Sequence, residues 1–382
     1  MNPIYANNAA GSWPLAPGVA EAVYEAMRQP AWQPGRDARG ESNVVENCRA
    51  RLAALLGVKD PARVVFTPNA SFALNLAILG LSLSDGDRVV TTVTEHNSVL
   101  RPLHLLEKEK GVRLTLIGLD STGRLDMDAF DDALRQGPSL VVCNHASNVT
   151  GRVNDVAAIF SRAKARGAAT LLDASQSLGY LPVSPSALHA DLIAFPGQKG
   201  LRGPVGTGAL YISPEIKLRQ IWMGGTGIRS DVRLHPEPMP LRHEMGTVNV
   251  PALAGLAAAL AWREEHGGDF REHARRVTRE FRDRLREIPG VHIFDDDDAC
   301  PRVNVVSFRL AEWSVEEAGY VLAESFQIFC RTGLHCAPRI HSHIGSAPDG
   351  TVRMSFSGCT TESDVETILS AIKELATCRL CA

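Results

Sequence analysis

The sequence has no apolar run of the ~20 residues that a membrane-spanning helix requires, and the apolar stretch at 252–262 is too short. The first five residues, beginning at Met1, lack the basic start and apolar core of a secretory signal. The formal net charge of -3 gives no reason to expect a nucleic-acid or membrane partner. Internal repeats and low-complexity linkers are also absent. We therefore expect an ordinary globular protein of the cytoplasm.

A disulfide framework is not expected, although the chain contains eight cysteines. Such frameworks belong to short secreted chains, whereas this one has 382 residues. Most of the cysteines should be small buried hydrophobic residues. A metal site is not predicted either. His335, Cys336, His341 and His343 lack the fixed scaffold of a ligand set, and the acidic run 295–298 is most simply a solvated turn.

Between residues 60 and 212 the sequence alternates strand and helix patterns. Strand patterns occupy 63–67, 88–93, 112–117, 140–143, 169–173, 192–195 and 208–212. Helical patterns occupy 71–81, 98–110, 126–135 and 153–166. This alternation predicts an α/β fold whose large domain holds a mainly parallel seven-stranded sheet with helices on both faces.

A smaller C-terminal α/β domain is predicted to follow. Its patterns are helices at 251–265 and 270–286, a strand at 302–308, a helix at 314–326, a strand at 351–356 and a helix at 363–375. We expect three parts. Residues 1–15 form an N-terminal segment that packs with the small domain, 16–250 form the large domain, and 251–382 form the small domain.

Lys199 follows a short apolar strand pattern and is enclosed by glycines. This arrangement suits a lysine that forms a Schiff base with a planar cofactor, because glycines let the backbone approach a bulky ring. Asp173 ends another apolar run, where it could pair with a pyridine nitrogen. Each feature alone has a simpler explanation, a surface turn for the lysine and a helix N-cap for the aspartate. Their order and spacing together indicate pyridoxal phosphate (PLP).

Polar residues follow several strands of the expected sheet. In such sheets, ligands bind beyond the carboxyl ends of the strands. Ser71, His96, Asn148, Asp173 and Lys199 all fall at such ends. The segments that contain them, spread over roughly residues 5 to 375, resemble the class V (fold type I) PLP-dependent aminotransferase superfamily.

The resemblance implies a role for each residue around the cofactor. Ala70 and Ser71 begin a helix and would bind the 5′-phosphate, although either could belong to a simple N-cap turn. His96 would stack on the pyridine ring and move protons. Asn148 would contact the phenolic oxygen or the substrate, and Gln176 would form a hydrogen bond to the phenolic oxygen.

Two further segments bear on the resemblance: one matches the family, and the other differs from its usual sequence. The loop 244–249 places Thr247 where relatives reach the phosphate of the neighbouring subunit, which implies a homodimer with shared active sites. Before the lysine, relatives commonly carry a hydroxyl and an imidazole, whereas this chain has Pro196, Gly197 and Gln198. Gln198 can still donate a hydrogen bond but Pro196 cannot, so we expect a weaker grip on the phosphate.

The segment 330–338 resembles the active-site cysteine segment of group II cysteine desulfurases and selenocysteine lyase-like enzymes. A thiolate is the nucleophile, and Arg331 and His335 would favour the ionised form of Cys336. A single loop cysteine is otherwise more often buried filler. Arg353 lies in a strand that resembles the family's Arg-x-Ser strand, whose arginine binds the substrate carboxylate. Arg331 is the second candidate for substrate binding.

The resemblance implies a PLP-dependent cysteine desulfurase. Lys199 would remove the Cα proton of L-cysteine and Cys336 would attack its sulfur. L-alanine would leave, with His96 as candidate acid, and the Cys336 persulfide would pass to a protein acceptor that the sequence does not identify. L-selenocysteine would fit the same pocket. Selenocysteine lyase, C–S lyase, aminotransferase and epimerase activities stay open, as does a weakly active sulfur-carrier or regulatory homologue.

The C-terminal tail carries Cys378 and Cys381. The pair could accept sulfur from Cys336 or supply half of a tetrahedral metal site. The simplest interpretation is an untidy terminus without a function.

Overall fold

The computed structural model describes residues 3–30, 44–228 and 230–378. Its large sheet has seven strands in the order β2-β8-β7-β6-β5-β3-β4. Strand β8 runs antiparallel to both of its neighbours, and the pairs from β7 to β4 are parallel. The strands are β2 (Val64–Thr67), β3 (Arg88–Thr92), β4 (Arg113–Ile117), β5 (Leu140–Asn144), β6 (Ala169–Asp173), β7 (Leu192–Pro196) and β8 (Gly208–Ile212). The predicted mainly parallel α/β sheet is confirmed.

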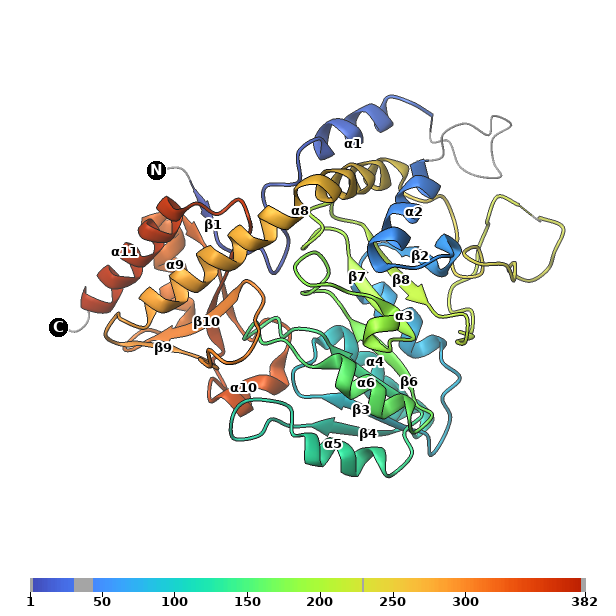
Figure 1. Cartoon of the computed structure of the whole chain (residues 1–382), viewed down its shortest axis with the longest axis horizontal. Helices are drawn as coiled ribbons and strands as arrows, with labels where there is room; N and C mark the ends of the chain where they lie inside the picture. The colour runs from blue at the N-terminus through green and yellow to red at the C-terminus, as the bar shows by residue number, and fades with distance from the viewer. Residues whose placement is uncertain (1–2, 31–43, 229, 379–382) are drawn as a thin grey trace.

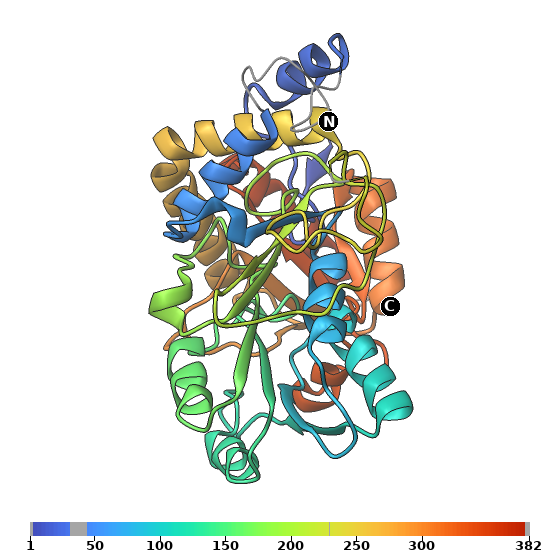
Figure 2. The ribbon, with the colours of Figure 1, turned by 90° about the vertical axis from the view of Figure 1, so that its right-hand side faces the viewer.

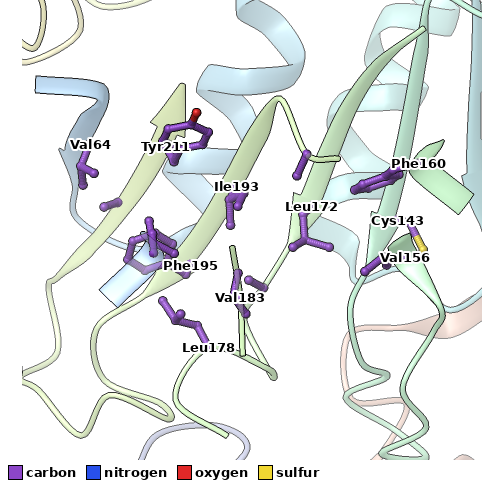
Figure 3. Close-up of a cluster of buried hydrophobic side chains, with 14 of the residues drawn as sticks. Val64, Cys143, Val156, Phe160, Leu172, Leu178, Val183, Ile193, Phe195 and Tyr211 are labelled. Carbon is purple, nitrogen blue, oxygen red and sulfur yellow. The ribbon is translucent and has the colours of Figure 1, made fainter. Parts of the chain in front are cut away.

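Alternate side chains of the strands enter two separate cores, one on each face of the sheet. Ile193 and Phe195 of β7 pack into one core with α2 (Val44–Leu56) and α6 (Val156–Lys164) (Figure 3). Leu192 and Ala194 of the same strand pack into the other with α3 (Ala70–Gly80) and α4 (Asn97–Lys110). Figure 2 shows the sheet between these two groups of helices. Burial on both faces explains why the strands read as continuous apolar runs.

The remaining helices of this half are short. They are α1 (Val19–Met27), α5 (Met127–Leu134) and α7 (Pro185–Leu188), and a 3₁₀ turn lies at Pro61–Arg63. Asp126 and Asp155 cap α5 and α6 by accepting backbone N–H groups with their side chains.

A second, antiparallel sheet has the strand order β12-β13-β10-β9. It consists of β9 (Val291–Ile293), β10 (Val305–Leu310), β12 (Arg331–Gly333) and β13 (Thr351–Ser355), with α9 (Val315–Phe326), α10 (Pro338–Ile344) and α11 (Glu362–Cys378) nearby. The N-terminal strand β1 (Ile4–Tyr5) pairs in parallel with β11 (Ile328–Phe329). The N-terminal segment thus lies against the small sheet (Figure 1). The sequence patterns did not show β1, β9, β11 or β12, because strands of two or three residues have no measurable periodicity.

One helix, α8 (Val250–Leu285), replaces the two helices expected at 251–265 and 270–286. The expected break at Gly267 and Gly268 lies inside this continuous 36-residue helix. The first part of α8 packs on α1 and α2, and Val277, Phe281 and Leu285 belong to the core of the small sheet. The helix therefore joins both halves of the molecule (Figure 1), and the boundary proposed at 250/251 falls at its first turn.

Within the described ranges, no helix is long and apolar enough to cross a membrane. The seven described cysteines are all free thiols, and Cys381 lies outside the described residues.

The two glycines inside α8 give a paired test of its continuity. A Cβ at Gly268 would meet open space, whereas one at Gly267 would lie 2.8 Å from Cγ of Arg263. Because alanine restricts the unfolded chain, we expect Gly268→Ala to raise the free energy of unfolding by about 0.5–1 kcal/mol. Gly267→Ala should give no such gain. Urea unfolding of both variants measures the difference, and a loss of stability in Gly268→Ala would show that the helix is broken there.

Candidate active site

A pocket with about 540 Å³ of empty space lies beyond the carboxyl ends of β3, β5, β6 and β7. Eight of the residues singled out from the sequence line it: Ala70, Ser71, His96, Asn148, Asp173, Gln176, Gln198 and Lys199. The pocket also includes Asn69, Ser98 and Asn144, which the sequence analysis missed. Four predicted residues, Arg331, Cys336, Arg353 and Thr247, are not part of this lining.

The Lys199 loop is held through its backbone carbonyl groups, which accept hydrogen bonds from other segments of the chain. Ser12 donates to the carbonyl oxygens of Lys199 (2.7 Å, from Oγ) and Gln198 (2.8 Å, from N). Arg263 donates to the carbonyl oxygens of Gly179 and Gly200. Burial lowers the pKa of the Lys199 amine to about 8, with Asp173 opposing the shift and Arg353 adding to it. The amine is therefore still mostly protonated near physiological pH, but far more of it is neutral than for an ordinary lysine.

The glycines around Lys199 serve a different purpose from the one expected. A Cβ at Gly200 would lie 2.3 Å from the carbonyl oxygen of Leu178, and one at Gly179 would lie 2.3 Å from the backbone of Gly200. At Gly208 it would meet the backbone of Asn69 at 2.7 Å. These glycines let segments of the chain pack on one another. The expectation that glycines of this loop also allow close approach to a ring stays a prediction.

Asp173 and Gln176 reach the pocket from the end of β6. Asp173 is buried, and its carboxylate accepts from the backbone N–H of Ser175 at 2.9 Å. Gln176 donates its amide to the carbonyl oxygen of Ala9 at 3.0 Å. That amide group therefore holds the N-terminal segment in this structure.

The start of α3 forms another wall. Asn69 caps the helix, because its side chain accepts a hydrogen bond from the N–H of Phe72. The first residues of the helix, Ala70 and Ser71, line the pocket, so the N-terminal end of the helix faces it. The hydroxyls of Ser71 and Ser98 are hydrogen-bonded at 2.6 Å. The simpler interpretation of this segment, a serine or asparagine N-cap, is met by Asn69.

His96 is the N-cap of α4, and its Nδ1 accepts from the N–H of Ser98 at 3.0 Å. Burial lowers the pKa of its imidazole to about 4. The ring is therefore neutral at physiological pH, with its proton on Nε2. A neutral imidazole is a poor acid, so the proton delivery suggested for His96 is better suited to Lys199.

Cys336 lies in a short loop between β12 and α10, and Arg331 Nη2 donates to its sulfur at 3.1 Å. Three hydrogen bonds hold this loop, two to its backbone carbonyl groups and one between side chains. The Asn148 amide donates to the carbonyl of His335 at 2.8 Å, the N–H of Asn97 donates to that of Cys336 at 2.7 Å, and His335 Nε2 is 2.8 Å from Thr351 Oγ1. Cys336 and His335 both have left-handed backbone conformations, with φ values of 59° and 52°.

Arg353 is buried beside this loop. Its Nη1 donates to the Asn148 carbonyl at 3.0 Å and its Nη2 to Asn7 Oδ1 at 2.9 Å, while Nε has no hydrogen-bond partner within the described chain. Burial, with Arg331 nearby, lowers the pKa of its guanidinium to about 9. The role of Asn7 was not visible from sequence, because the contact joins residues far apart in the chain.

Thr247 is exposed and lies away from the pocket in this chain. Its loop begins at Glu244, which forms a buried ion pair with Arg49 at 2.7 Å and accepts from the N–H of Phe66 at 2.7 Å. This pair holds the base of the loop against β2.

No three histidine, cysteine, aspartate or glutamate side chains gather to hold a metal ion within residues 3–30, 44–228 and 230–378.

A mainly parallel sheet with a lysine after β7 and an aspartate at the end of β6 defines the fold type I enzymes. Residues 7–368 match the family model described as aminotransferase class-V. The chain therefore belongs to the class V aminotransferase family.

Several relatives carry a more specific name. The chain is 30% identical over 379 residues to a probable cysteine desulfurase of Methanothermobacter thermautotrophicus, covering 97% of this chain and 94% of that one. It is 35% identical over 320 residues to a probable cysteine desulfurase of Pyrococcus abyssi, with coverage of 82% and 78%. The apo structure of the cysteine desulfurase from Thermococcus onnurineus superposes with a TM-score of 0.88 at 31% identity, covering 98% of this chain and 94% of that chain.

The lowered pKa of Lys199 can be measured directly in the cofactor-free protein. We expect acetylation of its amine by a trace reagent, followed by mass spectrometry, to rise with pH around a midpoint of about 8. Since Asp173 stabilises the ammonium form, Asp173→Asn should move the midpoint lower still. An exposed lysine in the same digest, such as Lys108, is the internal reference. A Lys199 midpoint at the reference value would contradict the burial of the amine.

Proposed function

We propose that this protein is a PLP-dependent cysteine desulfurase that converts L-cysteine to L-alanine and leaves the sulfur as a persulfide on Cys336. The observation that carries the proposal is the position of the Cys336 thiol beside Arg331, in a loop tied to the pocket that contains Lys199. Cys336, Arg331 and Arg353 all contribute to the electrostatic environment of the Lys199 amine. The names of the relatives support the same activity.

The residues of the pocket fit PLP. Lys199 supplies a partly neutral amine, and Asp173 supplies a buried carboxylate for the ring nitrogen. The start of α3, with Ala70 and Ser71, offers amide and hydroxyl donors for a phosphate. Gln198 Oε1 is buried without a hydrogen-bond partner in the described chain, and an amide flip would present a donor there. Bound PLP would supply an electron sink for a carbanion at Cα.

The roles of the chain's own residues follow from their positions. Arg353 would bind the carboxylate of L-cysteine, since its Nε has no other partner and its position is fixed by Asn7 and Asn148. The neutral Lys199 amine would take the Cα proton and return a proton to the product. His96 would pack on the ring as a neutral imidazole. Arg331 would stabilise the Cys336 thiolate that attacks the sulfur.

A homodimer with shared active sites is part of the proposal. Thr247 is exposed at the end of its loop, where a second copy could use it. Phe72 of α3 and the loop residues Met223 and Met245 expose large apolar side chains, at 44%, 62% and 46%. Exposed apolar side chains mark a contact surface only where they form one patch, and the proposal is that these residues do so at the interface with a second copy.

L-Selenocysteine as a second substrate, the protein sulfur acceptor and the cytoplasmic location stay predictions from the sequence. The C-terminal pair is divided: Cys378 ends α11 and is exposed, and Cys381 lies outside the described residues.

The activity test compares alanine release from L-cysteine by the wild type and by Cys336→Ala. Removing the nucleophile should lower kcat by about 10³-fold or more, because no other group replaces the sulfur. Cys378→Ala, which removes an exposed thiol from another helix, should keep wild-type activity under reducing conditions. The cofactor absorbance should be unchanged in both variants. Alanine release that survives in Cys336→Ala would favour a lyase without a persulfide.

Substrate binding by Arg353 is tested by two substitutions. Arg353→Lys keeps a positive charge but loses the forked geometry, so kcat/KM for L-cysteine should fall by about 10- to 100-fold. Asn7→Ala leaves the guanidinium in place without one of its supports, so we expect a smaller fall, mainly through a higher KM. Steady-state kinetics separates the two, and equal kinetics for wild type and Arg353→Lys would remove Arg353 from the substrate site.

A further inference from the structure

A groove lined with arginines runs between the C-terminal half of α8 and the segment 301–304 that leads into β10. It consists of two adjoining cavities that share Arg275, Arg279, Arg302 and Asn304. One of them holds about 760 Å³ of empty space. The groove is distinct from the pocket of Lys199, since the two have no lining residue in common.

Three arginines of α8 contribute positive charge to the groove, one more than the two unpaired acids that line it. Arg271, Arg275 and Arg279 follow one another at intervals of four, so they lie on one face of the helix about 6 Å apart. Like charges at this spacing repel each other. In the part of the chain that the structure describes, none of the three forms a salt bridge.

The other charged groups of the groove are largely paired. The arginines at 276, 282 and 302 form ion pairs with Glu362, Asp298 and Asp295, respectively. Asp269 and Glu272 also line the groove, but neither has a salt bridge to the three arginines. The balance of the free groups is therefore cationic.

The floor of the groove contains buried polar groups without hydrogen-bond partners. Asn304 is only 6% exposed, and its Nδ2 has no hydrogen-bond partner among the described residues. The buried hydroxyl of Tyr180 lines the same groove and lies near the Asn304 amide, although the two do not meet full hydrogen-bond geometry. The amide has two N–H groups and Tyr180 can accept at most one of them, so an acceptor atom of a ligand would be favourable for the other.

We propose that this groove binds a small polyanion, with the arginines of α8 contacting its outer charged groups and Asn304 donating to an oxygen at the floor. A multiply phosphorylated molecule and a tricarboxylate share this chemistry. A small ligand is favoured over a macromolecule because the floor donors are buried in a recess. The proposal is independent of the desulfurase activity, although Tyr180 follows Gly179, which contacts Gly200 beside Lys199.

The test is calorimetric titration of the PLP-loaded wild-type protein with inorganic tripolyphosphate and, separately, with citrate. We expect saturable binding of at least one of them at one site per chain, weakening as salt is added. Tighter binding of tripolyphosphate would indicate a phosphorylated ligand, and tighter binding of citrate would indicate a carboxylate ligand. The cofactor absorbance should not change, because the anion does not enter the Lys199 pocket.

Three variants locate the site. Arg275→Gln with Arg279→Gln should weaken binding by about tenfold or more, since two charge-assisted contacts are lost. Asn304→Asp, which places a negative charge at the floor with little change of shape, should weaken it as well; Asn304→Ala replaces it if the aspartate variant does not fold. The control is Lys108→Gln with Lys110→Gln, which removes two exposed charges from α4 and should have no effect.

Three results would overturn the proposal. The first is an absence of saturable binding up to about 10 mM of either anion, which is far weaker than ligand sites usually are. The second is an equal loss of affinity in the α4 control, which would mean attraction by overall charge. The third is binding that depends on Arg275 and Arg279 but not on Asn304, which would place the anion on the outer helix surface.

Discussion

The close contact between the Lys199 loop and the segment before α7 is the constraint on which the active site depends. Gly179 and Gly200 approach so closely that neither position has room for a Cβ. The loop satisfies only some of its own carbonyl groups, since the N–H groups of Arg202 and Gly203 donate to Lys199 and Gly197. The carbonyl groups of Gln198 and Gly200 need donors from elsewhere in the chain. Ser12 and Arg263 supply those donors. The N-terminal segment, α8 and the large sheet are therefore all needed to place one amine.

Arg202 strengthens the same junction. Its guanidinium lies over the rings of Trp262 and Phe270, at 4.7 and 4.5 Å from their centroids. It also donates to the carbonyl oxygens of Pro14 and Leu15. Cation–π contacts are strongest where water is excluded, and this side chain is almost fully buried. The long helix α8 thus fixes the Lys199 loop and the N-terminal segment with two arginine contacts, at Arg202 and Arg263. This explains why α8 continues through Gly267 and Gly268, since a break there would separate the two halves that it aligns.

The electrostatics of the site follow from this packing. Lys199, Arg331 and Arg353 bring three cationic groups together, and each of the two arginines lowers the pKa of the lysine amine. Asp173 and Cys336 oppose the effect. An amino-acid carboxylate would be attracted to such a site, because it neutralises charge that the protein leaves in excess. Burial, with the repulsion from the two arginines added to it, keeps part of the lysine neutral, which is the state that a proton acceptor needs.

The sequence predicted the structure best where strand and helix patterns alternate along the chain. The strands of the large sheet were predictable because apolar runs of five residues recur between helical patterns. Asp173 and Lys199 could be found because each follows such a run. Arg49 and Asn7 could not be found, because their partners Glu244 and Arg353 are distant in sequence and no local pattern marks the pairing. The break expected in α8 was wrong because glycine lowers helix propensity by only about 1 kcal/mol, and packing on both cores outweighs this.

The loop of Cys336 shows how position and strain are combined. Two consecutive non-glycine residues, His335 and Cys336, adopt left-handed conformations, each of which costs roughly 1–2 kcal/mol. The conformation persists because both carbonyl groups are hydrogen-bonded, to Asn148 and to Asn97. Asn97 directly follows His96 and Asn148 lines the pocket, so the thiol loop is bonded to two walls of the site. A shift of either wall would therefore move the sulfur, and the distance from the thiol to the substrate is set by the same contacts that shape the pocket.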